Sequence, residues 1–341
     1  MARRRDATME DVANHAGVAL SSVSRVLNDH PDVSDRMKQR VMGAIADVGY
    51  EPNLLASSLR RGSTKTIGFL ASDISNPLFA EIALGAERRL DEAEYTMVLT
   101  NSEGSGERDE EMIRLLRWRR TDGLILSVSD ERRAGTLVEL ARLDVPVVLI
   151  DRDVKGLDDA SVVTSDHARG MRSAVDHLIE LGHTDIALIS GPRQLRPARE
   201  RLRVFRRAFR DQQLEPPEHL LRIGSFSAQS GEQATLDLLA SDRPPTAMIA
   251  GGNLLLTGVL RALRRRKLTV GRDIALVSCD EVPLTELHSP PITVIARDAV
   301  HMGDLAAELL LERLVGDAEP RRAVVPTSLI VRDSTKKARR R

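Results

Sequence analysis

The stretch EDVANHAGVALSSVSRVLN, residues 10–28, contains two short helical patterns that meet at Gly17. Thr8, with Asp11 three residues later, is typical of a capping box in which aspartate replaces the usual glutamate. Glycine adopts the left-handed conformation that ends a helix without a Cβ clash, so we expect the first helix to end at Gly17. The stretch therefore predicts a compact pair of helices.

The apolar spacing that follows adds a third helix, which is expected to begin at Ser34 and to end at Gly49. Three small helices around a few aliphatic side chains indicate a helix-turn-helix domain. The alternative is a plain helical bundle with a serine-rich surface. The residues expected to form the core are Met9, Val12, Ala13, Ala16, Val23, Val26, Leu27, Met37, Val41, Ala44, Ile45 and Val48.

The composition is that of a globular protein with more than one domain. The 341 residues are 42% hydrophobic and include 50 Lys and Arg against 50 Asp and Glu, so net charge does not indicate a polyanionic partner. The single cysteine, Cys279, excludes an intramolecular disulfide, and no His and Cys spacing is that of a metal site. Because neither an export signal nor a long apolar run is present, we expect a cytoplasmic protein without a membrane partner, metal or cofactor.

After residue 62 short apolar runs alternate with amphipathic helical patterns. One series contains IGFLAS, TMVLTN, GLILSV and VPVVLID, and after VVTSD a second contains IALIS, LLRIGSF, AMIAGG and IALVSC. Repeated strand–helix units predict parallel sheets with helices on both faces, and two series predict two similar α/β lobes. The prolines Pro290-Pro291 and Pro326 are expected to mark crossings between the lobes.

Several ordered motifs resemble the lactose-repressor/galactose-repressor (LacI/GalR) family. They are DVANHAGVALSSVSRVLN, VSDRMKQRVMGAIADVGYEPNLLASSLR, DISNPLFAEI, LIELGHTDIALISGP and SPPITVIARD. The resemblance implies a transcriptional repressor that binds a pseudo-palindromic operator DNA as a homodimer or a tetramer and is controlled by a small sugar or polyol effector. The alternative is a sugar-binding protein of the same fold with no regulatory role, which would have no use for a helix-turn-helix.

The resemblance also implies the order of the domains. A helix-turn-helix head would be followed by a hinge helix and then by a periplasmic-binding-protein-like domain of two doubly wound α/β lobes, which binds effector and dimerises. The expected ranges are 1–50 for the head, 51–62 for the hinge, 63–335 for the large domain (first lobe 63–164 and 291–325, second lobe 165–290 and 326–335) and 336–341 for a basic tail.

Carried over by position, the resemblance places the second helix in the major groove of DNA. Arg25 is the expected base reader, since a guanidinium can donate two parallel hydrogen bonds to guanine; a surface salt bridge is the alternative. Ala19 stands where the family usually has a serine or threonine cap. Leu59 of the hinge would wedge into the minor groove, unless it is a core leucine of a linker helix. The expected DNA-binding residues are Thr8, Ala19, Leu20, Ser21, Ser22, Ser24, Arg25, Asn28, Asn53, Ala56, Leu59 and Arg60.

The cleft between two doubly wound lobes lies outside the carboxyl ends of their strands. Aspartates at such a place can accept hydroxyl groups, arginine can donate to ring or acid oxygens, and aromatic faces can stack on sugar C–H surfaces. Each residue could also have a purely structural role. Asp151 could cap a turn, Phe79 or Phe226 could belong to the core, and Arg201 could form a surface ion pair. The expected effector-binding residues are Asp73, Asn76, Phe79, Ser127, Asp151, Arg201, Phe226, Asn253 and Asp280.

Some cleft positions depart from the family pattern. Gly252-Asn253 stands where Asn-Asp is common, His167 where Asn is frequent, Val204 where Gly usually follows the arginine motif, and Cys279 where Tyr is common. We therefore expect a cleft with altered chemistry.

An enzyme is not expected from this sequence. GSGERD, residues 104–109, has only the first two glycines of a dinucleotide fingerprint. Ser165, Asp166 and His167 are sequence neighbours, and adjacency alone cannot form a catalytic triad.

Overall fold

The computed structural model describes residues 7–27, 30–50, 62–316 and 318–337. The chain divides into two compact units, residues 1–64 and 65–341, so the division falls two residues beyond the expected one. Within the described ranges, none of the helices has both the length and the apolar character needed to cross a bilayer.

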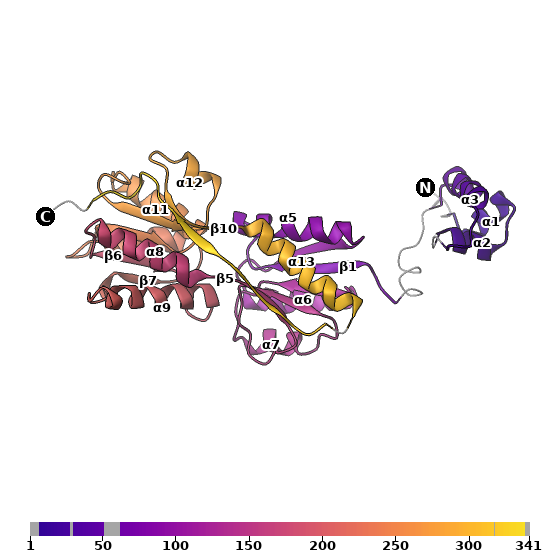
Figure 1. Cartoon of the computed structure of the whole chain (residues 1–341), viewed down its shortest axis with the longest axis horizontal. Helices are drawn as coiled ribbons and strands as arrows, with labels where there is room; N and C mark the ends of the chain where they lie inside the picture. Colours follow the sequence, from indigo (N-terminus) through magenta and orange to yellow (C-terminus); the bar gives the residue numbers. More distant parts are fainter. Residues whose placement is uncertain (1–6, 28–29, 51–61, 317, 338–341) are drawn as a thin grey trace, which may run out of the picture. The chain divides into compact units, whose positions relative to one another are not determined.

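The first unit is a bundle whose turns match the sequence signals. The Thr8 hydroxyl accepts the Asp11 N–H at 3.2 Å and the Asp11 carboxylate accepts the Thr8 N–H at 2.8 Å, which confirms the capping box. Gly17 is left-handed, with φ 61°, and ends the first helix as predicted. The helices in this unit are α1 (Met9–Ala16), α2 (Leu20–Leu27) and α3 (Asp35–Val48) (Figure 1).

The turn between α1 and α2 is tied to α3. Arg40 of α3 donates from Nη2 to the Gly17 carbonyl at 3.4 Å, and a Cβ on Gly17 would lie 2.8 Å from the same nitrogen. Ser34 caps α3 and Gly49 ends it, both as predicted. Every residue expected in this small core is either buried there or packed against it as a partly buried side chain.

The second unit consists of two lobes, as predicted, and each lobe is built on a six-stranded sheet. The first lobe contains β1 (Thr66–Ala71), β2 (Thr96–Asn101), β3 (Gly123–Leu126), β4 (Val147–Ile150), β5 (Ser161–Ser165) and β11 (Arg322–Val325) in the order β11-β5-β4-β3-β1-β2. Its helices are α5 (Pro77–Glu92), α6 (Gly106–Trp118), α7 (Ala134–Leu140) and α13 (Ala299–Val315). All strand pairs in this sheet are parallel.

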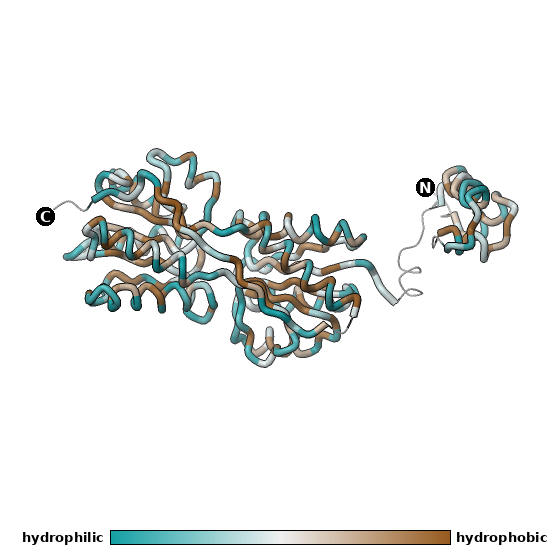
Figure 2. Tube along the Cα trace, in the orientation of Figure 1, coloured by the Kyte–Doolittle hydropathy of each residue, from teal (hydrophilic) through white to brown (hydrophobic). Residues whose placement is uncertain are grey.

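Apolar residues concentrate along the strands (Figure 2). Successive side chains of a strand point to opposite faces of its sheet. Ile67 and Phe69 of β1 pack with α5 and α13, whereas Leu70 packs with α6 and α7. The helices α5 and α13 approach closely: a Cβ on Gly85 would lie 1.9 Å from the Val300 carbonyl oxygen, and a Cβ on Gly303 would lie 1.9 Å from that of Ile82. This crossing requires glycine on both helices.

The second lobe repeats the architecture. Its strands are β6 (Ile186–Ser190), β7 (Leu221–Ile223), β8 (Ala247–Ala250), β9 (Ala275–Cys279), β10 (Thr293–Arg297) and β12 (Thr327–Ile330), in the order β12-β10-β9-β8-β6-β7. Its helices are α8 (His167–Glu180), α9 (Arg196–Asp211), α10 (Ala228–Leu239), α11 (Asn253–Arg265) and α12 (Pro283–Leu287). Only β12 runs antiparallel to its neighbour. α8 and α9 cover one face of the sheet, and α10 and α11 cover the other.

The chain passes between the lobes in places that differ in part from the sequence expectation. The crossing expected at Pro290-Pro291 is wrong, because β10 (Thr293–Arg297) pairs with β9 and β12 in the second sheet. Residues 291–297 therefore belong to the second lobe, and the chain returns to the first with α13. At Pro326 a crossing does occur, since β11 and β12 on either side belong to different sheets.

Candidate functional site

The outer face of α2 is polar and exposed. Val23 and Val26 are buried beneath it, while Ser21 and Arg25 lie on the exposed side. Leu20, at the start of the helix, is 45% exposed, so an apolar side chain stands beside the polar ones. This surface offers a guanidinium, a hydroxyl and one apolar contact to a partner.

The other residues expected to contact DNA vary in their surroundings. Thr8 is engaged in the capping box. The Ala19 carbonyl accepts the N–H groups of Ser22 at 2.9 Å and Val23 at 3.3 Å, so Ala19 stands at the helix start without a side chain that could cap it. Ser22 and Ser24 are partly exposed. Outside the described residues lie Asn28, Asn53, Ala56, Leu59 and Arg60.

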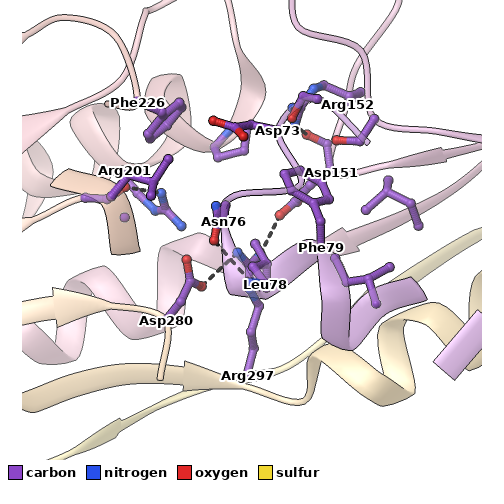
Figure 3. Close-up of a pocket in the computed structure, with 18 residues that line it drawn as sticks. Asp73, Asn76, Leu78, Phe79, Asp151, Arg152, Arg201, Phe226, Asp280 and Arg297 are labelled. Atoms are coloured by element: carbon purple, nitrogen blue, oxygen red, sulfur yellow. Dashed lines mark hydrogen bonds and ion pairs between the residues drawn. The ribbon is translucent and has the colours of Figure 1, made fainter. Parts of the chain in front are cut away.

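A pocket lies in the second unit, lined from both lobes at the carboxyl ends of their strands (Figure 3). The empty space in it is about 600 Å³, a figure that includes open solvent. Asn253 does not line it, but its Nδ2 donates to Asn76 Oδ1 at 3.1 Å. The other expected effector residues do line it: Asp73, Asn76, Phe79, Ser127, Asp151, Arg201, Phe226 and Asp280.

The parallel strands explain why these distant residues meet. Asp73, Ser127 and Asp151 follow β1, β3 and β4 of the first lobe, and Asp280 follows β9 of the second. Asp151 and Asp280 both take the left-handed conformation, with φ 51° and 70°, which aspartate tolerates better than most residues. The carboxyl ends of the strands thus bring the predicted side chains to one place.

The structure also bears on the structural roles that were considered as alternatives to effector binding. Arg201 is not a surface arginine: it is 5% exposed and its Nη1 donates to the Gly251 carbonyl at 2.6 Å. Phe79 belongs to the first-lobe core and also lines the pocket. Asp151 does not cap a local turn, since the N–H that its carboxylate accepts is that of Ser165, 14 residues away.

Sequence reasoning missed further lining residues, of which Arg297 is the most strongly engaged. It ends β10 in the same way that Asp151 and Asp280 follow their strands, and it belongs to the SPPITVIARD motif. A charged residue that closes an apolar strand was the available signal. The missed lining residues are Ser72, Leu78, Ile82, Ile150, Arg152, Pro197, Gly251, Leu254 and Arg297, whereas Gly252 was already placed in the cleft as a departure from the family pattern.

Asp151 is the centre of a buried charge cluster. Its Oδ1 accepts the Ser165 N–H at 3.0 Å and Arg196 Nη1 at 3.1 Å. Its Oδ2 lies 3.0 Å from His167 Nε2 and 2.6 Å from Arg297 Nη1. Burial opposes ionisation, but these contacts hold the pKa of the Asp151 carboxyl well below its usual range.

The departures from the family pattern are mostly buried. Burial lowers the pKa of His167 to about 4, so its imidazole is neutral near pH 7 and donates from Nε2 to the carboxylate of Asp151. Val204 and Cys279 lie in the apolar core of the second lobe, and burial raises the pKa of the Cys279 thiol. Gly252 lines the pocket beside Phe226.

The groups weighed for catalysis serve structural roles. Asp166 accepts the Arg169 N–H and so caps α8, while the Ser165 hydroxyl accepts Arg297 Nη1 at 2.6 Å, so the two do not form a triad with His167. In GSGERD the Ser105 side chain caps α6. Across the described ranges, no group of three or more His, Cys, Asp or Glu side chains could hold a metal ion.

Comparisons with known proteins agree with this architecture. Residues 8–53 match the bacterial regulatory proteins of the lacI family, and residues 175–335 match a periplasmic binding protein-like domain. The chain is 34% identical to the ribose operon repressor of Escherichia coli K12, over 90% of this chain and 93% of that protein.

Two solved structures show the same fold. The Lac repressor dimer bound to operator and the anti-inducer ONPF has a TM-score of 0.85 at 30% identity, covering 97% of this chain and 100% of that one. The transcriptional regulator CelR in complex with cellobiose has a TM-score of 0.73 at 33% identity, covering 96% and 99%. The chain belongs to the LacI family of bacterial regulatory proteins.

Proposed function

We propose that this chain is a transcriptional repressor that binds a pseudo-palindromic operator as a homodimer and is controlled by a small sugar-like effector between its lobes. The observation that carries the proposal is the exposed polar face of α2, in a chain that also has an inter-lobe pocket. A binding protein without a regulatory role would need the pocket but not this helix.

On the DNA side, Arg25 is assigned to base readout. Its guanidinium is exposed on the helix that a helix-turn-helix inserts into the major groove, and Val23 and Val26 anchor the opposite face. One such helix reads few base pairs, so two copies related by a two-fold axis would read two half-sites. The remaining proposed contacts are Thr8, Ala19, Leu20, Ser21, Ser22, Ser24, Asn28, Asn53, Ala56, Leu59 and Arg60.

Selection from random duplexes tests this assignment. The full chain should enrich a pseudo-palindrome of roughly 14 to 20 base pairs, as two half-sites one helical turn apart require. Arg25→Ala should weaken the selected site by about 1 to 3 kcal/mol and leave random DNA nearly unaffected. Arg36, an exposed arginine of α3, is proposed as a further contact, to phosphate, so Arg36→Ala should weaken binding to both duplexes to the same extent. An equal loss on both duplexes for Arg25→Ala would make Arg25 a phosphate contact.

On the effector side, a sugar is favoured by the lining. Asp73 offers acceptors, Arg201 offers donors, and Phe226 offers a flat apolar face. Asn76 can donate from its amide nitrogen, because its Oδ1 already accepts the Leu78 N–H and Asn253 Nδ2. The sugar names carried by relatives, ribose and cellobiose, agree with this chemistry.

A thermal-shift screen with ribose, cellobiose and other sugars, followed by operator titration, tests the effector site. Arg201→Ala should keep operator binding and lose the response to the sugar that shifts the wild-type protein. Arg203→Ala is the matched control, because Arg203 lies exposed on the same helix and pairs with Glu200. A full response in Arg201→Ala would remove Arg201 from the site.

A further inference from the structure

Arg297 lines the pocket and forms ion pairs with residues of both lobes. It ends β10 of the second lobe, and its side chain is 5% exposed. Nη2 lies 2.7 Å from Asp280 Oδ1 in its own lobe, whereas Nη1 lies 2.6 Å from Asp151 Oδ2 in the other (Figure 3). One guanidinium therefore joins a carboxylate of each lobe.

Asp151 has no hydrogen-bonding capacity left for a ligand. Each of its oxygens already has two partners, and an ionised carboxylate has about four acceptor sites. Three of the partners, His167, Arg196 and Arg297, come from the second lobe. A first-lobe residue with this many second-lobe partners holds the lobes together.

We propose that Arg297 is a built-in clamp of the effector cleft, which fastens Asp151 to Asp280 and keeps the lobes closed in the absence of ligand. The proposal deepens the proposed function, on which it rests, by assigning Asp151 and Arg297 to positioning the lobes. Direct effector contact is left to other lining residues, such as Asp73 and Arg201.

The physical basis is the cost of separating buried charges. Opening the lobes would break the charge-assisted hydrogen bond between Arg297 and Asp151, which is stronger than a bond between neutral groups, while Arg297 would stay paired with Asp280. The fork of a guanidinium suits this task, because it presents separate N–H groups to two carboxylates. An effector can shift the lobe arrangement only by its differential affinity for the closed and open forms. The clamp favours the closed form, and so it biases the same equilibrium between closed and open lobes that the effector shifts.

Other contacts across the cleft limit how far the lobes move when the clamp is lost. Glu131 of the first lobe accepts the Arg196 N–H at the start of α9 at 2.7 Å. Asn253 donates to Asn76, as described above. Loss of Arg297 should therefore widen the distribution of lobe separations and should not free the lobes.

Spin-label distances in ligand-free and DNA-free protein test the clamp. Labels on cysteines introduced at Glu111 of α6 and Gln233 of α10 would report the separation of the lobes, because both positions are exposed and Cys279 is buried. A small fraction of labelled chains mixed with unlabelled chains confines the signal to pairs within one chain. Arg297→Gln should give a longer and broader distance distribution than the wild-type residue.

Matched variants separate the clamp from general effects of charge loss. Arg297→Lys keeps the charge but cannot form a fork, so it should shift the distribution less than Arg297→Gln. Arg203→Gln, which breaks an exposed pair within α9, should leave it unchanged.

Unchanged distributions in both Arg297 variants would overturn the clamp. If Arg297→Gln does not fold, the lysine variant alone decides in the same way. Since no effector or operator is present, a negative result would leave the proposed repressor function standing, and a failure to bind operator would not bear on the clamp.

Discussion

The three-helix unit and the effector cleft differ in how far apart in the sequence their determinants lie. Thr8 and Asp11, which cap α1, are three residues apart. The partners of Asp151 lie 14, 16, 45 and 146 residues away, at Ser165, His167, Arg196 and Arg297. Local sequence signals therefore suffice to predict the helices of the first unit. The charge pairs of the cleft, in contrast, form only when the complete fold brings distant residues together.

The largest expected effect is that of a glycine substitution in the second unit, set against a glycine substitution of opposite sign in the first. Gly303→Ala on α13 should destabilise the second unit by about 3 kcal/mol or more, because its Cβ would meet backbone of α5 that cannot move aside. Gly43→Ala on exposed α3 should stabilise the first unit by about 0.5 to 1 kcal/mol, since a Cβ there meets nothing within 4 Å and alanine favours helix.

Calorimetric unfolding of the full chain measures both changes. Changes of opposite sign in the two unfolding midpoints would support the contrast between local and long-range determinants of stability. An unchanged midpoint for Gly303→Ala would show that α5 and α13 separate without cost.

The next effect is a pH dependence confined to the cleft. The pKa of His167 is about 4 in the folded chain and 6.5 as the unfolded reference, so the unfolded chain binds more protons between these values. The free energy of unfolding should therefore fall as pH falls from 6.5 to 4, by up to about 3 kcal/mol from this group.

Urea unfolding of wild type and His167→Asn between pH 7.5 and 4 checks this dependence. The variant should show the shallower decline. Burial also lowers the pKa values of His177 and His183, but both histidines remain in the variant and cancel in the difference. Parallel pH curves would place the titration elsewhere.

The smallest effect concerns helix caps in the first unit. Thr8→Ala should cost about 1 kcal/mol, because it removes one half of a reciprocal capping box. Ser34→Ala should cost less, since Ser34 accepts only the Met37 N–H, at 3.4 Å. Thermal unfolding of the first unit within the full chain measures both, and a larger loss for Ser34→Ala would contradict the reading of the capping box.

The sequence predicted the three helices of the first unit, their caps and their core, because capping residues, Gly17 and helical spacing act over a few positions. The hinge expected over residues 51–62 lies, except for Gly62, outside the described residues. It also predicted which strand ends meet at the cleft, since parallel strands place their carboxyl ends along one edge. Asp73 and Arg201 were found in this way.

The roles within the cleft were harder to predict. Asp151 was expected to bind effector, but no local pattern shows that Arg297 already satisfies it. Asn253 was expected in the pocket, but it does not line it and instead donates to Asn76, which does. The crossing expected at Pro290-Pro291 failed because proline marks the end of an element and does not say which sheet the next strand joins.

The two lobes are interleaved along the chain, and this has a consequence for how the protein is made. The first lobe lacks α13 and the edge strand β11 until residues 299–325 have left the ribosome, and the second lobe lacks β12 until residue 330. The three helices of the first unit, the last of which ends at Val48, can fold long before. A prematurely terminated chain would therefore carry an intact DNA-binding head beside two unfinished sheets with unpaired edges, a product suited to aggregation and degradation. Whether the nascent chain completes both lobes thus depends on residues 299–330, which supply α13, β11 and β12.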